Sequence, residues 1–376
     1  MIYFDNASTT SVRTEVRRVY GQLIETCYGN PDSLHAMGRQ ASSLMEKSRN
    51  NIATMLHVLP GEIIFTSAAS ESNSLAIVGY ALANHHRGNH ILTSNVEHSS
   101  VRHSMEFLKT QGFDVEFLPI NEEGIITEDC LRQHMRKDTI LVSLMHVNNE
   151  MGAINPIREL EPIVHANPTC VFHVDCVQSF SKIEVPFEIL DMATISAHKI
   201  HGLKGSAILV KKKKIQLVPL IHGGQQEQGL RGGTENAPAN IVLSKTIRMA
   251  LEEMKDAYAY VLELNSYLRE ELLKIEGAHI HSPQNALPYI LNISFDQVTS
   301  EVLLNALDQK GICVSAKSTC SSQNTNASEV LLAMNKTEFD ATHGIRLSFS
   351  NENTLEETKY FIQACKEIIR DYGLPL

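Results

Sequence analysis

The sequence predicts an α/β fold with a mostly parallel seven-stranded sheet flanked by helices, followed by a smaller α+β domain. Between residues 60 and 210, short apolar runs alternate with amphipathic stretches, which is typical of strands and helices in a parallel sheet. A single helical pattern then extends from Pro238 to Leu273 without an internal glycine. Beyond Gly277 strands and helices form a shorter series, which indicates a second, smaller unit.

The seven expected strands of the large unit are short runs of mainly apolar residues, the length and composition of buried strands. They are Ile63–Thr66, Ile91–Ser94, Val115–Leu118, Ile140–His146, Val171–Asp175, Met192–Ser196 and Ala207–Val210. The helices expected between them have apolar residues at helical spacing. These helices are Glu71–His85, Val101–Gln111, Glu128–Met135 and Ile157–His165.

The C-terminal stretch predicts a smaller unit of three strands and three helices. Its expected strands are Tyr289–Phe295, Ile312–Ser315 and Ile345–Phe349, and its expected helices are Ser300–Gln309, Ser328–Met334 and Leu355–Arg370. A chain of 376 residues is long enough for two domains. We therefore expect an N-terminal segment, residues 1–15, that packs with the small domain, a large domain over 16–255, and a small domain over 256–376.

Composition and charge exclude several classes of protein. The contents of 43% hydrophobic and 20% charged residues are ordinary for a soluble globular protein, and no apolar stretch reaches the ~20 residues that cross a bilayer. An acid at Asp5, where a signal peptide would carry lysines, favours a cytoplasmic location. The net charge of −10 argues against binding of duplex nucleic acid. Seven scattered cysteines without a Cys-x-x-Cys pair predict reduced thiols rather than a disulfide framework or a metal site.

Lys199 is the most informative residue of the chain. It follows the expected strand Met192–Ser196, in a turn that reads Ser-Ala-His-Lys-Ile-His-Gly. A partly desolvated lysine loses its proton more readily, and the free amine can attack an aldehyde. Pyridoxal 5'-phosphate (PLP) is the cofactor that uses such a lysine, and it needs an Asp opposite its ring nitrogen. Asp175, at the end of another buried strand, supplies that carboxylate.

Other polar residues follow the remaining strands, at the sheet edge where ligands of open α/β sheets bind. The loop Ser67–Asn73 offers hydroxyls and N–H groups at a helix start, which suit a phosphate ester. His98 can stack on a flat ring or move a proton, and Asn149 can hydrogen-bond a phenolic oxygen. Together these loops predict one cofactor site.

Several motifs spread over the whole chain are specific to one family. They are Tyr3-Phe-Asp5-Asn6-Ala7-Ser-Thr-Thr10, Gly29-Asn30-Pro31-Asp-Ser-Leu-His35, the strand-end loops above, Arg231-Gly-Gly-Thr234-Glu-Asn236, the cysteine loop Ser318-Thr-Cys320-Ser-Ser, and Gly344-Ile-Arg346-Leu-Ser348. Through them the chain resembles the cysteine desulfurases, PLP enzymes of the class V aminotransferase group with an aspartate-aminotransferase type of fold. The resemblance runs essentially from end to end.

This resemblance implies a role for each matching residue. Lys199 would hold PLP covalently, and Asp175 would keep the ring nitrogen protonated. The other implied cofactor contacts are Ala69, Ser70, His98, Asn149, Gln178, Ser196 and His198, with Thr234 reaching the phosphate of a neighbouring subunit. Thr234 thereby implies a homodimer. Arg346, helped by Asn30, would bind the substrate carboxylate as a bidentate fork.

Cys320 would be the catalytic nucleophile. The family converts L-cysteine to L-alanine, and a thiolate at Cys320 would take up the substrate sulfur as a persulfide. His98 would accept the proton of the substrate thiol. The sulfur would then pass to an acceptor protein, as this family serves iron–sulfur scaffolds, tRNA thiolation and thiamine synthesis.

Two other enzymes of the same fold remain open at this point: a selenocysteine lyase and an aminotransferase for a small amino acid. An aminotransferase has no use for Cys320, and a selenocysteine lyase depends on it little. A sulfur carrier with a vestigial cofactor site would lack Lys199 or Asp175, and both are present. A nicotinamide-dependent oxidoreductase is excluded because no Gly-x-Gly-x-x-Gly motif follows the first strand.

Overall fold

The computed structural model describes residues 1–316 and 327–372, and its seven-stranded sheet has the strand order β2-β8-β7-β6-β5-β3-β4. The strands are β2 (Ile63–Thr66), β3 (His90–Ser94), β4 (Asp114–Leu118), β5 (Thr139–Met145), β6 (Val171–Asp175), β7 (Met192–Ser196) and β8 (Ala207–Lys211). Each coincides with an expected strand to within one residue at either end. Only β8 runs against its neighbours β2 and β7, which confirms the mostly parallel sheet.

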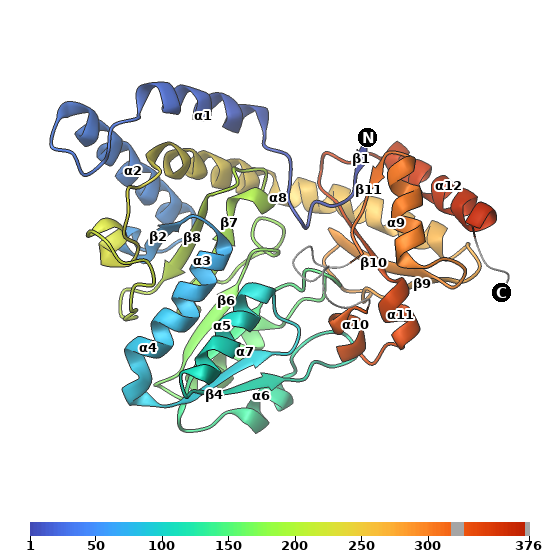
Figure 1. Cartoon of the computed structure of the whole chain (residues 1–376), viewed down its shortest axis with the longest axis horizontal. Helices are drawn as coiled ribbons and strands as arrows, with labels where there is room; N and C mark the ends of the chain where they lie inside the picture. Colours follow the sequence, from blue (N-terminus) through green and yellow to red (C-terminus); the bar gives the residue numbers. More distant parts are fainter. Residues whose placement is uncertain (317–326, 373–376) are drawn as a thin grey trace.

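Helices cover both faces of this sheet (Figure 1). They include α5 (Ser99–Thr110), α6 (Glu128–His134) and α7 (Ile157–His165), as expected. The expected helix Glu71–His85 is interrupted, because a π-helical turn, η2 (Leu75–Gly79), separates α3 (Ala69–Ser74) from α4 (Tyr80–Asn84). The Gly79 carbonyl, at the end of this turn, accepts from the Val218 N–H at 2.9 Å, and the backbone dihedral angles stay helical at both junctions.

Two helices that were not predicted precede the sheet, α1 (Thr14–Thr26) and α2 (Ala36–Met55). They pack against α8 (Ala237–Leu272), the long helix predicted from residues 238–273. The Ser48 hydroxyl of α2 donates to the Asn240 carbonyl of α8 at 2.8 Å. The first half of α8 is buried against the large sheet, while Val261 and Leu268 of its second half belong to a second core.

That second core is built around a three-stranded antiparallel sheet of order β12-β10-β9. Its strands are β9 (Ala278–Ile280), β10 (Ile290–Phe295) and β12 (Ile345–Ser348), and its helices are α9 (Ser300–Gln309), α10 (Glu329–Ala333), α11 (Glu338–His343) and α12 (Leu355–Tyr372). The expected strand Ile312–Ser315 is shorter, because β11 ends at Cys313 and Ser315 forms an isolated bridge with Arg346.

The N-terminus is part of this second core. Strand β1 (Ile2–Tyr3) pairs with β11 (Ile312–Cys313), and Phe4 packs edge-on against Phe349 and Phe361. The chain then passes between the two cores before α1 begins. The domain boundaries at residues 15 and 255 stay a prediction. Residues 1–13 contribute to the candidate site described below.

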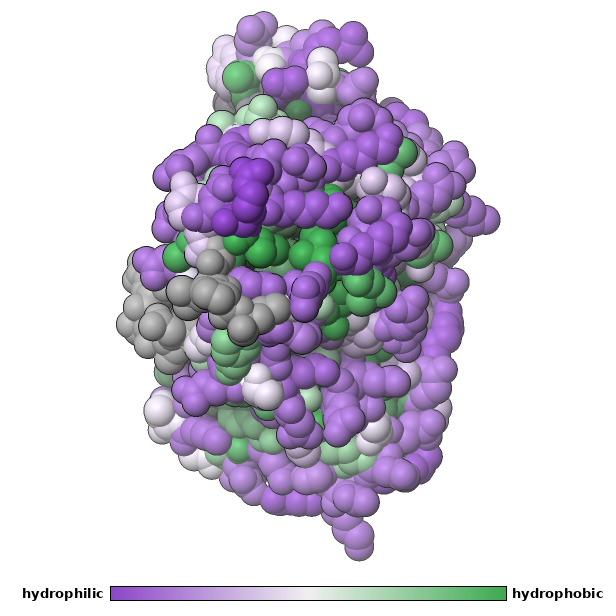
Figure 2. Space-filling model, turned by 90° about the vertical axis from the view of Figure 1, so that its right-hand side faces the viewer, coloured by the Kyte–Doolittle hydropathy of each residue, from purple (hydrophilic) through white to green (hydrophobic). Residues whose placement is uncertain are grey.

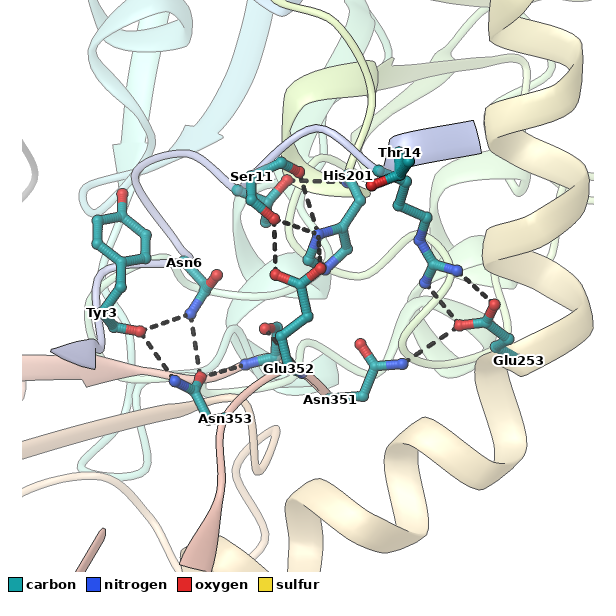
Figure 3. Close-up of polar contacts among 12 residues, drawn as sticks. Tyr3, Asn6, Ser11, Thr14, His201, Glu253, Asn351, Glu352 and Asn353 are labelled. Atoms are coloured by element: carbon teal, nitrogen blue, oxygen red, sulfur yellow. Dashed lines mark hydrogen bonds and ion pairs between the residues drawn. The ribbon is translucent and has the colours of Figure 1, made fainter. Parts of the chain in front are cut away.

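Polar contacts fix this N-terminal segment on both sides (Figure 3). The Ser11 hydroxyl donates to the Glu352 carboxylate at 2.6 Å, and the Arg13 guanidinium forms a bidentate ion pair with Glu253 of α8. His201, in the loop after β7, donates its backbone N–H to the Thr10 hydroxyl at 2.8 Å. Residues 10–13 are therefore held by α8, the β7 loop and the segment that follows β12.

The surface at the end formed by the C-terminal elements is mostly hydrophilic, with hydrophobic residues gathered in a patch near the middle of this face (Figure 2). Within residues 1–316 and 327–372, none of the helices combines the length and apolar composition needed to span a bilayer.

Candidate active site

A cavity of about 220 Å³ lies at the carboxyl ends of the strands of the large sheet. The loops that follow β2, β3, β5, β6 and β7 all reach it, as do the N-terminal segment and β12. The residues that line it are Ala7, Ser8, Ala68, Ala69, Ser70, Asn73, His98, Met145, Val147, Asn149, Asp175, Val177, Gln178, His198, Lys199 and Arg346. Most of the residues expected at the site therefore meet in one cavity.

Asp175, the last residue of β6, presents a buried carboxylate to this cavity. Its Oδ2 accepts from the Asn73 side-chain amide at 2.8 Å, and its Oδ1 accepts from the Val177 N–H at 3.0 Å. Asn73 also donates to the Ser100 hydroxyl at 2.9 Å, which fixes the amide from a third loop. No role of its own was predicted for Asn73, because its partner lies 102 residues away.

The Lys199 ammonium lies against the N-terminal segment. Its Nζ donates to the backbone carbonyls of Ala7 at 2.5 Å and Ser8 at 2.7 Å. The 3₁₀ turn Ala197–Lys199, η4, follows β7 directly, and its His198 carbonyl accepts from the Thr10 N–H at 2.9 Å. The end of β7 and the N-terminal segment thus hold the lysine together.

Gln178 shares one of these carbonyl groups. Its Nε2 donates to the Ala7 carbonyl at 2.9 Å, and its Oε1 accepts from the Lys182 ammonium at 3.2 Å. Lys182 is buried and was not singled out in the sequence, where it reads as an ordinary loop lysine.

The expected phosphate contacts lie around the start of α3 and the end of β7. Ala69 and Ser70 occupy the first turn of α3 and line the cavity. Ser196 does not line it, but its buried Oγ has no hydrogen-bond partner among the described residues. The His198 ring lies 3.2 Å from the Thr9 hydroxyl, and burial together with the positive charge of Lys199 lowers the pKa of His198 to about 4.

His98 stands at the N-cap of α5 (Ser99–Thr110). Its Nδ1 accepts from the Ser100 N–H at 3.2 Å, so the ring is held at the cavity wall by its own helix. A ring fixed at this place can face a flat cofactor, as the sequence predicts.

Arg346, in β12, is almost fully buried and lines the cavity from the second core. Its guanidinium donates to Asp5 Oδ1 at 2.8 Å, to the Ser8 hydroxyl at 2.7 Å and to the Asn149 carbonyl at 2.8 Å. Its Nε has no partner among the described residues. The backbone carbonyl of Asn149 thus contacts Arg346, and Asn149 also lines the cavity.

Besides Ser196, two expected site residues of the described part of the chain do not line this cavity, Asn30 and Thr234. Both are exposed, and the Asn30 side chain accepts from the Asp32 N–H at 3.0 Å. The role expected of Thr234 concerns a second chain and stays a prediction, as does that of Asn30. Cys320 lies outside the described residues.

The residues present fit PLP. A carboxylate buried in the cavity has amide donors but, among the described residues, no cation within ion-pair distance, which suits a protonated ring nitrogen. The unpartnered Ser196 hydroxyl beside the first turn of α3 suits a phosphate group. A lysine amine lies in the same cavity, which suits an aldehyde.

Comparison with known proteins gives a consistent result. The family model described as "Aminotransferase class-V" matches residues 2–361. The chain is 40% identical to "NifS/IcsS protein homolog" of Lactobacillus delbrueckii subsp. bulgaricus, over 99% of this chain and 98% of that protein. It is 40% identical to "Cysteine desulfurase IscS" of Dictyoglomus turgidum, over 98% and 94%. A solved structure titled "NIFS-LIKE PROTEIN" superposes with a TM-score of 0.92 at 37% identity, covering 98% of this chain and 99% of that one.

Proposed function

The chain belongs to the class V aminotransferase family, and we propose that it is a cysteine desulfurase that converts L-cysteine to L-alanine and transfers the sulfur. It is a PLP-dependent enzyme, as the family is. The observation that carries the proposal is the convergence of Lys199, Asp175 and Arg346 on one cavity. The names of relatives that are 40% identical over nearly the whole chain support the desulfurase activity in particular.

When bound, PLP supplies an electron sink next to the substrate α-carbon. Lys199 would hold it covalently, and Asp175 would keep a proton at its ring nitrogen. Because Asn73 and the Val177 N–H both donate to Asp175, this carboxylate is held in place at the cavity. Ser70, Ser196 and His198 would hold the phosphate, and His98 would lie against the ring.

Arg346 orients the substrate by its carboxylate. The guanidinium is planar and already held by Asp5 and Ser8, so little of its freedom is lost when a substrate carboxylate binds. Binding at this point holds the substrate by its carboxylate end and leaves its thiol free to react.

Cys320 takes the sulfur. Its thiolate attacks the substrate sulfur, the carbon–sulfur bond breaks, and a sulfur–sulfur bond forms on the enzyme. The carbon that loses sulfur gains a proton and becomes the methyl group of alanine. One cysteine and one enzyme thiol thus give one alanine and one persulfide, without an external oxidant. His98 accepts the proton of the substrate thiol.

Further features belong to the same proposal. The enzyme is a homodimer in which Thr234 reaches the partner's site, and it works in the cytoplasm, where its thiols stay reduced. The six cysteines in the described part of the chain are all unpaired, which supports a reducing compartment. A sulfur-acceptor protein of iron–sulfur cluster, thio-tRNA or thiamine synthesis receives the persulfide sulfur.

Purified wild type, Cys320→Ala and Cys130→Ala proteins test this function, with alanine and sulfide measured after addition of L-cysteine and a thiol reductant. Cys130 is a partly exposed cysteine outside the cavity, so its variant controls for a general thiol effect. We expect alanine from wild type and Cys130→Ala and almost none from Cys320→Ala, with PLP bound in all three.

Other results would favour the alternatives. Equal alanine formation by Cys320→Ala and by wild type would indicate a lyase that needs no catalytic cysteine residue. Selenocysteine would then be the preferred substrate. Amino transfer to a keto acid without alanine formation from cysteine would indicate an aminotransferase.

A further inference from the structure

Lys182 is a buried cation without a carboxylate partner. It lies in the segment that follows β6, with only 8% of the residue exposed. Its Nζ donates to Gln178 Oε1 at 3.2 Å and lies 5.6 Å from the centroid of the Tyr289 ring. No carboxylate of the described residues lies within ion-pair distance of it. A buried charge without an anion opposes folding, so such a lysine calls for an explanation.

Two positive charges, those of Lys199 and Arg346, act on Lys182. Burial, with the positive charges of Lys199 and Arg346, lowers the pKa of Lys182 to about 7. A lysine amine donates a hydrogen bond whether it carries two or three protons. The hydrogen bond to Gln178 is therefore available in both protonation states.

Lys182 determines which way the Gln178 amide points. The Ala7 carbonyl can only accept, so it takes the amide nitrogen at 2.9 Å, while the Lys182 amine donates to the amide oxygen. A reversed amide would place its NH₂ group against an ammonium and its oxygen against a carbonyl. With one N–H on Ala7, the second N–H of Gln178 remains for a ligand in the cavity, which Gln178 lines.

We propose that Lys182 is a positioning residue of the PLP site, which holds the Gln178 amide so that its nitrogen donates to the cofactor's phenolic oxygen. The inference rests on the proposed function, since it concerns the site for PLP. This role also explains why no carboxylate of the described residues pairs with Lys182: the lysine serves to bind the cofactor and not to stabilise the fold.

Lys182→Met tests this, since methionine is unbranched and flexible and lacks both the charge and the donor. The dissociation constant of PLP is measured on apoprotein by titration, and the free energy of unfolding of the apoprotein by urea. We expect the PLP dissociation constant to rise about 5- to 20-fold, as loss of one hydrogen bond predicts, while the urea midpoint stays equal or increases.

Lys211→Met is the matched control. Lys211 is also buried, and its Nζ donates to the Ile215 carbonyl at 3.0 Å. It pairs in register with Met192, at the opposite end of β7 from Lys199. We expect this variant to bind PLP like the wild type.

Lys182→Arg should restore binding, because it keeps a donor and a charge. A cavity of about 40 Å³, lined among others by Lys182, Lys199 and Tyr289, leaves room for the larger group. We expect a PLP dissociation constant within about 3-fold of wild type.

The outcomes separate the inference from the proposed function. Wild-type affinity in folded Lys182→Met would overturn the inference alone, as would a Lys182→Met chain that does not fold, because Lys182 would then be structural. Failure of wild type to bind PLP would overturn the inference and the proposed function together.

Discussion

The Arg346 side chain both holds protein groups in place and lines the cavity. Its guanidinium links Asp5 and Ser8 of the N-terminal segment to the Asn149 loop, and it also lines the cavity. Arginine can hold protein groups at one side and a carboxylate at another because its donors form a planar fork. Lysine has three donors on one nitrogen and cannot do both.

Arg346→Lys should therefore weaken substrate binding more than turnover. Losing a bidentate, charge-assisted contact predicts a KM for L-cysteine about 10- to 100-fold higher. Steady-state kinetics with alanine as the measured product checks this, alongside PLP content. Arg269→Lys is the control, since Arg269 is largely buried and bonds the Ser282 and Pro283 carbonyls away from the cavity. An unchanged KM in a folded Arg346→Lys enzyme would contradict the assignment.

The sequence indicated those site residues that follow strands and carry chemistry of their own. Lys199, Asp175, Gln178 and His198 belong to that group, and they lie at or beside the cavity. Asn73, Lys182 and Asp5 gave no such signal. Their contribution comes from partners that the fold brings close, as between Asp5 and Arg346, which are 341 residues apart.

At the scale of elements, apolar runs identified strands more reliably than helices. All seven strands of the large sheet were predicted because strands buried on both faces are continuously apolar. Helices α1 and α2 were not predicted because polar residues dominate their composition. In α1, Val16 is the only buried residue. The π-helical turn between α3 and α4 has no signal in the spacing of apolar residues, which continues as in an α-helix.

The N-terminal segment connects the second core to the candidate active site. Phe4 is fully buried in the second core, and within four residues the chain provides Asp5 to Arg346 and the Ala7 and Ser8 carbonyls to Lys199. The position of these groups therefore depends on how firmly Phe4 is anchored.

Phe4→Ala should impair both stability and cofactor binding. Removal of this ring leaves a cavity beside Phe349 and Phe361, which predicts a loss of about 3–5 kcal/mol in the free energy of unfolding. Because residues 5–8 lose their anchor, PLP affinity should fall as well. Urea unfolding and PLP titration measure the two effects. Phe107→Ala, at an exposed ring on α5, should change neither, and normal PLP affinity in Phe4→Ala would show that residues 5–8 are held by other contacts.

At the scale of the whole molecule, buried titratable groups make folding depend on pH. Burial lowers the pKa of His146 to about 4 and that of His173 to about 3. Both bind protons more readily when unfolded, where a histidine pKa is about 6.5. Above about pH 6.5 their contribution to the free energy of unfolding is fully present. It is lost as the pH falls toward 4.

Glu97 acts in the opposite direction. It is fully enclosed between the ends of β3 and β5, where its Oε1 accepts from the Ser94 hydroxyl at 2.5 Å and from the Met145 N–H at 3.1 Å. Burial is the main cause that raises the pKa of Glu97 to about 8, and the charge of Asp175 adds to it. The folded chain thus keeps a proton that the unfolded chain releases near pH 4.5, so stability falls as the pH rises from there to about 8.

Glu97→Gln separates this group from the histidines. Glutamine is neutral at every pH, and its oxygen can accept both hydrogen bonds that Oε1 accepts, so the fold should be retained. The free energy of unfolding of the variant should gain on the wild type by up to about 1.4 kcal/mol per pH unit above pH ~4.5, levelling off near pH ~8. Urea unfolding at pH 5, 6.5 and 8 measures it, with Glu106→Gln at an exposed site of α5 as the control. A constant difference between variant and wild type across this range would mean that Glu97 is ionised in the folded protein, with a second negative charge close to Asp175.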